Sequence, residues 1–197
     1  MTKPDFFSHL SASWEDRHQE PGELERLRHF SRHFRLQPGE RVLDAGCGCG
    51  RLVPVICEAI GANGRLVELD FAPGMLAIGR GKPHAGNVFF VLGDVHRLRL
   101  PDSGFDKVIA LALLPHIDDK VVALREFRRV LRPGGLLVIA HQMGREALDR
   151  LHNQGGDVIQ SDLLPEGTAL AGLLADAGFS DVEILDEPDQ YIAWARA

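Results

Sequence analysis

The glycine-rich stretch 42–50 constrains the fold of this chain more than any other feature. It runs Val-Leu-Asp-Ala-Gly-Cys-Gly-Cys-Gly. The apolar residues before Asp44 follow a turn signal at 37–40, which predicts a buried strand entered from a turn. Three alternate glycines come next, and the apolar run 51–60 predicts a helix. A strand, a glycine turn and a helix together let a ligand approach the backbone, close to the N–H groups that begin the helix.

The glycine spacing and the preceding acid indicate the chemistry of that ligand. A dinucleotide fingerprint has the order G-x-G-x-x-G and places pyrophosphate on the helix N-terminus. Here the order is G-x-G-x-G, and Asp44 stands at the end of the strand. A carboxylate would repel pyrophosphate but could bind an ammonium group. The pattern therefore favours a zwitterionic amino-acid ligand and weakens the alternative of a nicotinamide dehydrogenase.

Composition excludes several classes of partner. The net charge of −6 over 197 residues offers no basic surface for phosphates, so we expect no nucleic-acid partner. The sequence has no signal peptide and no apolar run of membrane length, so we expect no membrane partner. Cys47, Cys49 and Cys57 crowd into one segment and cannot form a framework of disulfides, which predicts a reducing, cytoplasmic location. We expect a single domain over 1–197.

Strand and helix patterns alternate along the rest of the chain. Buried strands are predicted at 41–44, 65–70, 88–92, 105–112 and 136–140, and a closing pair at 182–186 and 190–196. Helical patterns separate the earlier strands, and Thr168 is expected to cap a helix that ends before Gly178. Such alternation predicts an α/β fold with a parallel sheet and right-handed crossovers. Ligands bind such sheets beyond the carboxyl ends of the strands.

Two amphipathic helices are predicted before the sheet. Aromatic residues in 5–16 suit a helix that ends at the break 20–22. This first helix could cover the site as a lid or simply pack on the protein. The second helix starts at Glu23, and we expect one apolar stripe of Leu24, Leu27, Phe30 and Phe34 on it.

Several segments, in the right order, resemble the S-adenosylmethionine-dependent methyltransferases with a seven-stranded Rossmann-like fold. The matching segments are 42–50 (motif I), "DFAPGML" from Asp70, Gly93-Asp94, "FDKVIA" from Phe105, 113–119 and "RVLRPGG" from Arg129. Within that family the chain is most similar to the type 11 group of small-molecule and quinone methyltransferases. The resemblance implies a three-layer Rossmann-like sandwich, a mostly parallel seven-stranded sheet with a C-terminal antiparallel hairpin. Residues 1–36 would then be a helical lid segment and 37–197 the core.

The resemblance also implies a cofactor, S-adenosyl-L-methionine, and the residues that bind it. Asp70 would hold both ribose hydroxyls, Phe71 would sit beside the adenine, and Asp94 would accept a hydrogen bond from the adenine amino group. The candidate cofactor-binding residues are Asp44, Ala45, Gly46, Cys47, Gly48, Asp70, Phe71, Met75, Gly93, Asp94, Val95 and Leu111.

The expected reaction is methyl transfer to a small-molecule acceptor by in-line displacement. Residues 110–113 lack the Asn/Asp-Pro-Pro-aromatic sequence with which family members hold amide or amino nitrogens, so an O, C or S nucleophile is favoured. Proximity can supply much of the barrier reduction, so a base is optional. His116 and His141 are the candidate bases. Together with His152 they match no metal-ligand spacing, and no metal is expected.

Two alternatives stay open at this stage. The chain could be a binding module that holds S-adenosylmethionine or S-adenosylhomocysteine without catalysis. A second copy of the chain, in a homodimer, could complete a small acceptor site.

Overall fold

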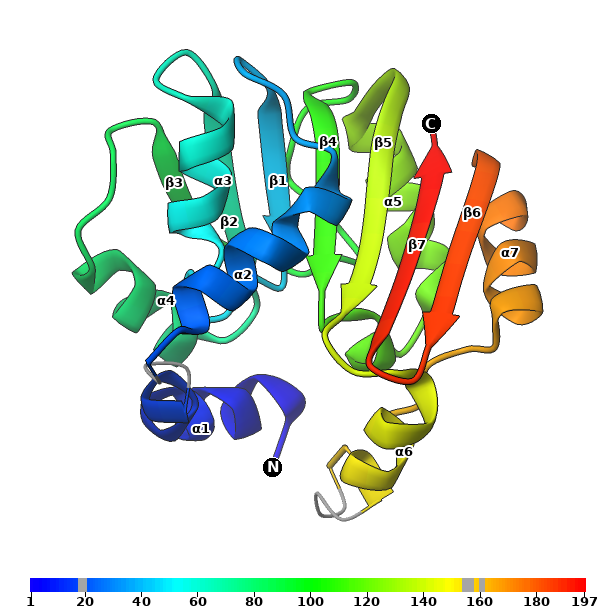
Figure 1. The fold of residues 1–197 in the computed structure, drawn as a ribbon, viewed down its shortest axis with the longest axis horizontal. Helices are drawn as coiled ribbons and strands as arrows, with labels where there is room; N and C mark the ends of the chain where they lie inside the picture. Colours follow the sequence, from blue (N-terminus) through cyan, green and yellow to red (C-terminus); the bar gives the residue numbers. More distant parts are fainter. Residues whose placement is uncertain (18–20, 154–157, 160–161) are drawn as a thin grey trace. The chain divides into compact units, whose positions relative to one another are not determined.

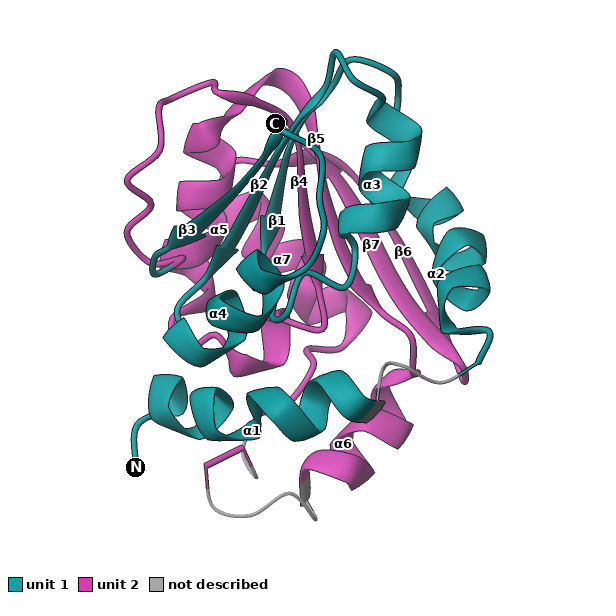
Figure 2. Cartoon of the chain, turned by 90° about the vertical axis from the view of Figure 1, so that its left-hand side faces the viewer, with its two compact units in different colours: residues 1–94 teal, residues 95–197 magenta. Residues whose placement is uncertain are grey.

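A computed structural model describes residues 1–17, 21–153, 158–159 and 162–197 of the chain (Figure 1). Seven strands occur in the order β3-β2-β1-β4-β5-β7-β6, and helices flank them. The predicted Rossmann-like fold, mostly parallel with a C-terminal antiparallel hairpin, is confirmed. The chain divides into two compact units, 1–94 and 95–197 (Figure 2), and each is described in turn. That the whole chain is one domain stays a prediction.

The sheet of the first unit is parallel throughout. It consists of β1 (Arg41–Ala45), β2 (Arg65–Asp70) and β3 (Val88–Leu92), with β2 in the middle. Short apolar runs bounded by turns gave these strands their predicted places. Asp44 lies opposite Glu68, and Glu68 lies opposite Phe90, so acidic residues meet at the carboxyl ends of β1 and β2.

The described residues of the first unit form five helical segments. They are α1 (Lys3–Arg17), α2 (Glu23–Ser31), the 3-10 helix η1 (Arg32–Phe34), α3 (Val53–Ile60) and α4 (Pro73–Gly81). Pro21 and Gly22 form the turn before α2, while residue 20 of the predicted break lies outside the described residues. Leu27, Phe30 and Phe34 are buried, but Leu24 is 41% exposed, so the predicted four-residue stripe was wrong at its first position. Steps of three residues fall about 60° short of a full turn, which carries Leu24 off the stripe.

The second unit combines parallel and antiparallel pairs. β4 (Phe105–Leu111) pairs in parallel with β5 (Leu131–His141), and β7 (Gln190–Arg196) pairs antiparallel with both β5 and β6 (Ser180–Glu187). β5 begins at Leu131 and not at Leu136 as predicted, because Leu131 already pairs with Phe105. A register shift absorbs the residues between, including Gly134 with its φ of +75°.

The helices of the second unit are η2 (Leu114–His116), α5 (Lys120–Val130), α6 (Arg145–Asn153) and α7 (Gly167–Asp176). Asp119 caps α5, accepting a hydrogen bond of 3.0 Å from the Val122 N–H. The predicted cap at Thr168 was wrong. The N-cap is Glu166, which makes no side-chain cap bond, and Thr168 already lies in the first turn of α7. Among the described residues, no helix is long and apolar enough to cross a membrane.

Candidate functional site

The loop after β1 requires its glycines. Gly46, Gly48 and Gly50 have φ values of +71°, +55° and +72°, in the left-handed region that side chains disfavour. A Cβ atom on Gly48 would also stand 3.9 Å from the Met75 sulfur, and one on Gly50 would press on the ring of Phe90 at 3.2 Å. The positive φ values thus explain the glycines of the predicted turn, and the approach of a ligand to this backbone stays a prediction.

The N–H groups of this loop point back to the protein. Gly46 and Cys47 both donate to the Leu69 carbonyl, at 2.7 and 3.0 Å, and Gly48 donates to the Asp70 carboxylate at 2.9 Å. A phosphate-binding loop needs such groups for its anion. Because β2 already engages them, the loop is poorly suited to pyrophosphate, in agreement with the inference from Asp44.

Three carboxyl groups gather on one face of the sheet beside the loop. Asp44 and Glu68 are cross-strand partners, and Asp70 projects to the same face as Glu68 because strand side chains alternate. Their exposed fractions are 2%, 0% and 6%. Neither carboxyl oxygen of Glu68 has a hydrogen-bond partner among the described residues. The three acids are therefore buried together, and the described residues supply no hydrogen bond to the carboxyl oxygens of Glu68.

Burial governs the protonation of this cluster. It raises the pKa of Asp44 to about 8, assisted by the negative charge of Asp70 and opposed by Arg51. Burial and the Asp44 charge raise the pKa of Glu68 well above its usual range. Burial likewise raises the pKa of the Cys47 thiol, and the adjacent carboxyls add to the effect. The site therefore retains protons that solvent-exposed acids would have lost near neutral pH.

Asp70 shapes the turn after β2. Its two carboxylate oxygens accept from the backbone N–H groups of Ala72 at 2.8 Å and Gly48 at 2.9 Å. Burial raises the pKa of Asp70, and these N–H donors oppose the increase. The Phe71 N–H also acts on this carboxylate. A carboxylate offers about four lone-pair positions, so these donors leave little more than one position for ligand hydroxyls. The local turn role and the predicted ribose role are compatible.

Helix α1 packs against α4, and Figure 2 shows these two helices as neighbours. The Cys49 thiol of the loop lies 3.7 Å from the Ser11 carbonyl oxygen on α1. Phe7, Trp14 and Phe71 surround a small cluster of Cys49, Ala72 and Met75. The backbones of α1 and α4 approach each other closely.

A Cβ atom on Gly74 would stand 2.8 Å from the Ser8 carbonyl oxygen, so glycine is needed where α4 meets α1. The ammonium group of Lys82 also forms an ion pair of 2.7 Å with Glu15. Packing of α1 is thus established, while a lid role stays a prediction.

The remaining candidates of the first unit follow β3. The Gly93 N–H donates to the Asp70 carbonyl at 3.0 Å, and a Cβ atom on Gly93 would meet the Leu69 side chain at 3.1 Å. Asp94 is exposed just beyond it. Asp44, Asp70 and Asp94 therefore lie at the carboxyl edge of three adjacent parallel strands, where they were predicted.

In the second unit, the candidate residues also follow strand ends. Val95 is buried at the start of this unit, Leu111 ends β4 and His141 ends β5, with Leu111 paired to Ala140. His116 ends η2, where its Nδ1 lies 2.7 Å from an Asp162 carboxylate oxygen. Both side chains are largely buried, 14% and 6% exposed.

His152 lies beside this pair. Its ring centroid is 5.1 Å from that of His116, and its Nδ1 contacts the Asp162 carbonyl. Sequence reasoning missed Asp162 because 46 residues separate it from His116 and no local motif marks it. It also left Glu68 outside the binding set, although a charged residue inside an apolar strand was a visible signal.

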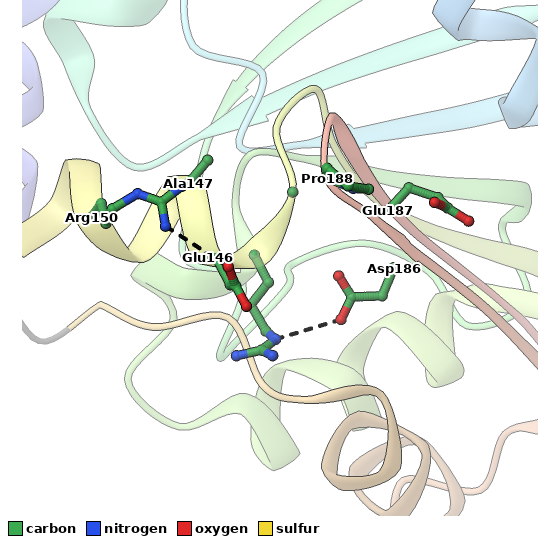
Figure 3. A pocket seen from close by; sticks show the side chains of 8 residues that line it. Glu146, Ala147, Arg150, Asp186, Glu187 and Pro188 are labelled. Carbon is green, nitrogen blue, oxygen red and sulfur yellow. Dashed lines mark hydrogen bonds and ion pairs between the residues drawn. The ribbon is translucent and has the colours of Figure 1, made fainter.

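Figure 3 shows a separate pocket of about 290 Å³ in the second unit, between the start of α6 and the β6–β7 turn. Arg145 lies 3.5 Å from Asp186, with Asp149 and Glu166 each at 4.0 Å. These acids balance the positive charge of Arg145. None of the site residues predicted from the sequence lines this pocket. Within the described part of the chain, no group of three or more His, Cys, Asp or Glu side chains is placed to hold a metal ion.

Comparison with known proteins identifies the family to which this chain belongs. Residues 43–139 match the family described as "Methyltransferase domain". A demethylmenaquinone methyltransferase of Staphylococcus haemolyticus is 36% identical over 56% of this chain, which spans only 47% of that relative. A ubiquinone/menaquinone biosynthesis C-methyltransferase UbiE of a Shewanella species is 30% identical over 81% of this chain and 74% of the relative.

Solved structures agree on the fold. A SAM-dependent methyltransferase from Aquifex aeolicus superposes with a TM-score of 0.75 at 20% identity, covering 100% of this chain and 99% of that one. A putative methyltransferase from Haloferax volcanii, solved with its Trm112 activator, has a TM-score of 0.76 at 19% identity, covering 97% of both chains. The chain belongs to the S-adenosylmethionine-dependent methyltransferases of the Rossmann-like class, and it is an enzyme whose cofactor is S-adenosyl-L-methionine.

Proposed function

We propose that this enzyme methylates a small molecule at an O, C or S nucleophile, and that its first unit binds the cofactor. The observation that carries the binding proposal is the set of buried carboxyls beside a loop whose own N–H groups are engaged. When bound, the cofactor supplies a methyl group on a positively charged sulfur. Carboxylates suit its ammonium group, its positive charge and its ribose hydroxyls, and they would repel a phosphate.

Each candidate residue has a proposed role in holding the cofactor. Asp44 binds the ammonium group, Asp70 accepts from the ribose hydroxyls and Asp94 accepts from the adenine amino group. The side chains of Phe71 and Met75 provide apolar contact to the adenosine. The proposed backbone contacts of the first unit come from Ala45, Gly46, Cys47, Gly48 and Gly93.

Among acceptors, we favour a phenolic or enolic ring that is methylated on carbon or oxygen. The name of the Shewanella relative specifies carbon methylation in ubiquinone/menaquinone biosynthesis, which supports this class. The end of β4 is apolar at Ala110, Leu111 and Leu113, which suits a ring better than an amide nitrogen. Methylation of such a ring is easier once its hydroxyl has lost a proton.

His116 is the proposed general base for that proton. A hydrogen on Nδ1, donated to Asp162 at 2.7 Å, fixes the tautomer in which Nε2 can accept. The carboxylate would also stabilise the imidazolium that forms. His141, at the end of β5, is the second candidate base.

Two experiments test this function. Calorimetry should show saturable binding of S-adenosylmethionine and S-adenosylhomocysteine, and an absence of binding would contradict the cofactor site. A methyl-transfer screen over phenols, quinols, thiols and small acids should then release S-adenosylhomocysteine with a phenolic or enolic ring. Turnover confined to thiols would contradict the acceptor class, and no turnover with any acceptor would favour a binding module.

The proposal also covers the domain organisation, location and oligomeric state of the enzyme. We propose a single domain in the cytoplasm, because none of the three cysteines forms a disulfide. The net charge of −6 argues against a nucleic-acid substrate. A homodimer that completes the acceptor site is a hypothesis, and a sedimenting monomer with full activity would exclude it.

A further inference from the structure

We propose that Asp44 and Glu68 share one proton in the ligand-free protein, and that the ammonium group of the bound cofactor displaces this proton into solvent. The inference rests on the proposed role of Asp44 in binding that group. It adds Glu68 to the site as a positioning residue, since Glu68 acts through the charge of Asp44.

The first step of the argument is the register of the two strands. Asp44 and Glu68 are direct partners across the parallel pair β1–β2, so both carboxyls stand on the same face of the sheet. Neighbouring strands are about 4.8 Å apart, and like charges directly opposite each other destabilise a sheet. Both side chains are also removed from water, at 2% and 0% exposure. Two ionised carboxylates at this place would repel each other without solvent screening.

The second step is the unmet hydrogen bonding of Glu68. Neither of its buried carboxyl oxygens has a hydrogen-bond partner among the described residues. A buried carboxylate in that condition is costly, whereas a protonated carboxyl carries no charge and supplies its own donor. One proton between the two residues therefore removes the repulsion and provides an O–H donor.

The third step is the charge balance of the surroundings. Asp70 adds a third carboxyl on the same face. The charge of Glu68 also contributes to the raised pKa values of two thiols, Cys47 in the loop and Cys57 on α3. Two cations oppose them. Each is already paired with another acid: Arg51 lies 2.6 Å from Glu23, and Lys82 lies 2.7 Å from Glu15. The cluster thus has a deficit of positive charge that a ligand ammonium group would meet.

The direction of the proton change follows. A cation next to the pair favours its ionised form, so binding lowers the pKa of the pair and releases its proton. Affinity should then rise with pH while the ligand-free pair is still protonated, up to about pH 8, the value to which burial raises the pKa of Asp44. At higher pH no proton remains to be released.

The test is calorimetry of S-adenosylhomocysteine binding at pH 6.5 in several buffers that differ in ionisation enthalpy. The slope of observed enthalpy against buffer enthalpy counts the protons released. At this pH the ligand amine is mostly charged, since its pKa is about 8. We expect at least half a proton released per ligand bound. Methylthioadenosine has the nucleoside but no ammonium group, and it should bind with a slope near zero.

Variants complete the design. Glu68→Gln mimics the protonated acid and removes one of the two carboxyls that share the proton. It should therefore release fewer protons per S-adenosylhomocysteine bound than the wild type, and its affinity should depend less on pH. Glu58→Gln changes an exposed carboxyl on α3, 60% exposed, and should behave as the wild type.

The outcomes separate the inference from the proposed function. Binding by the wild type without proton release, or an equal release with methylthioadenosine, would overturn the inference and leave the function standing. Absence of binding by the wild type would overturn the function itself. The methylthioadenosine comparison uses wild-type protein only, so it decides the question even if Glu68→Gln fails to fold.

Discussion

The acid cluster of the first unit and the His116–Asp162 pair of the second are both buried ionisable groups, and they are balanced differently. In the first, acidic side chains lie opposite each other, and the carboxyl oxygens of Glu68 have no hydrogen-bond partner among the described residues. In the second, a histidine and a carboxylate lie 2.7 Å apart and form an ion pair when the histidine is protonated. We propose that a cation from the ligand completes the first arrangement, whereas the second already pairs two groups of the chain.

This difference implies two kinds of task. A site that binds a cation gains affinity from acids that are poorly compensated before the ligand arrives, at a cost in stability. A base gains from a partner that fixes its tautomer and its orientation before reaction. Substitutions in the first unit should therefore change binding and stability, whereas those in the pair should change turnover.

The largest expected effect is on turnover. His116→Ala should lower kcat by a factor of about 10² to 10⁴, the usual contribution of a general base, and leave cofactor affinity nearly unchanged. Asp162→Asn should give a smaller loss and shift the acid limb of the pH–rate profile, because the imidazolium loses its carboxylate. Steady-state kinetics with the acceptor found in the screen would measure both.

His84→Ala is the matched control, since His84 is an exposed histidine of the first unit whose Nδ1 contacts the Ala85 carbonyl and whose ring lies 5.4 Å from that of Phe90. It should keep wild-type kcat. If His116→Ala turned over at the wild-type rate, His116 would not be the general base. His141 would then be the next base to test.

The next effect is on cofactor binding. Asp70→Ala removes an acceptor for both ribose hydroxyls, and hydrogen bonds to a charged group contribute about 1.5–3 kcal/mol each. The dissociation constant of S-adenosylhomocysteine should therefore rise by about 100-fold or more. Loss of the contacts with Gly48 and Ala72 would add to this by loosening the loop. Asp189→Ala, in the exposed β6–β7 turn, is the control. An unchanged constant in Asp70→Ala would mean that another group, such as Glu68, holds the ribose.

A third effect is on stability without ligand. An acid whose folded pKa lies above its unfolded value stabilises the protein at low pH, and this contribution is lost as the pH rises between the two values. For Asp44 that window runs from 3.8 to about 8. Glu68→Gln removes the opposing charge, so it should raise the free energy of unfolding at pH 8 by about 2 kcal/mol and have little effect near pH 4. Urea unfolding at both pH values would show it. An equal change at pH 4 and pH 8 would mean that packing, and not charge, explains the effect.

The sequence was sufficient for most of the fold because its signals are local. Strands such as Val88–Leu92 are apolar runs between turns, and their bounds were predicted to the residue. The early start of β5 was missed because Arg-Pro-Gly-Gly is a turn signal, and only the pairing of Leu131 with Phe105 shows that the strand has already begun.

The site was predictable only where a motif marks it. Asp70 ends β2, Asp44 is the last but one residue of β1, and Asp94 follows β3 by two residues; these positions near the carboxyl ends of the strands were predicted from sequence alone. Glu68 matters through its cross-strand partner, and Asp162 through a contact across 46 residues. Such tertiary pairings leave no periodic trace in one sequence, so they required the structure.

The smallest expected effect concerns α1, whose roles as a lid or as simple packing are still to be separated. Gly74→Ala places a methyl group 2.8 Å from the Ser8 carbonyl oxygen and should displace α1 from α4, at a cost of about 1 kcal/mol in stability. Gly81→Ala is the matched control in the same helix, because nothing lies within 4 Å of its added methyl group and alanine favours a helix. If α1 is a lid, Gly74→Ala should also weaken cofactor binding severalfold by calorimetry. A loss of stability with unchanged affinity would show that α1 only packs on the protein, and the first unit would then bind the cofactor through its carboxyls and loop alone.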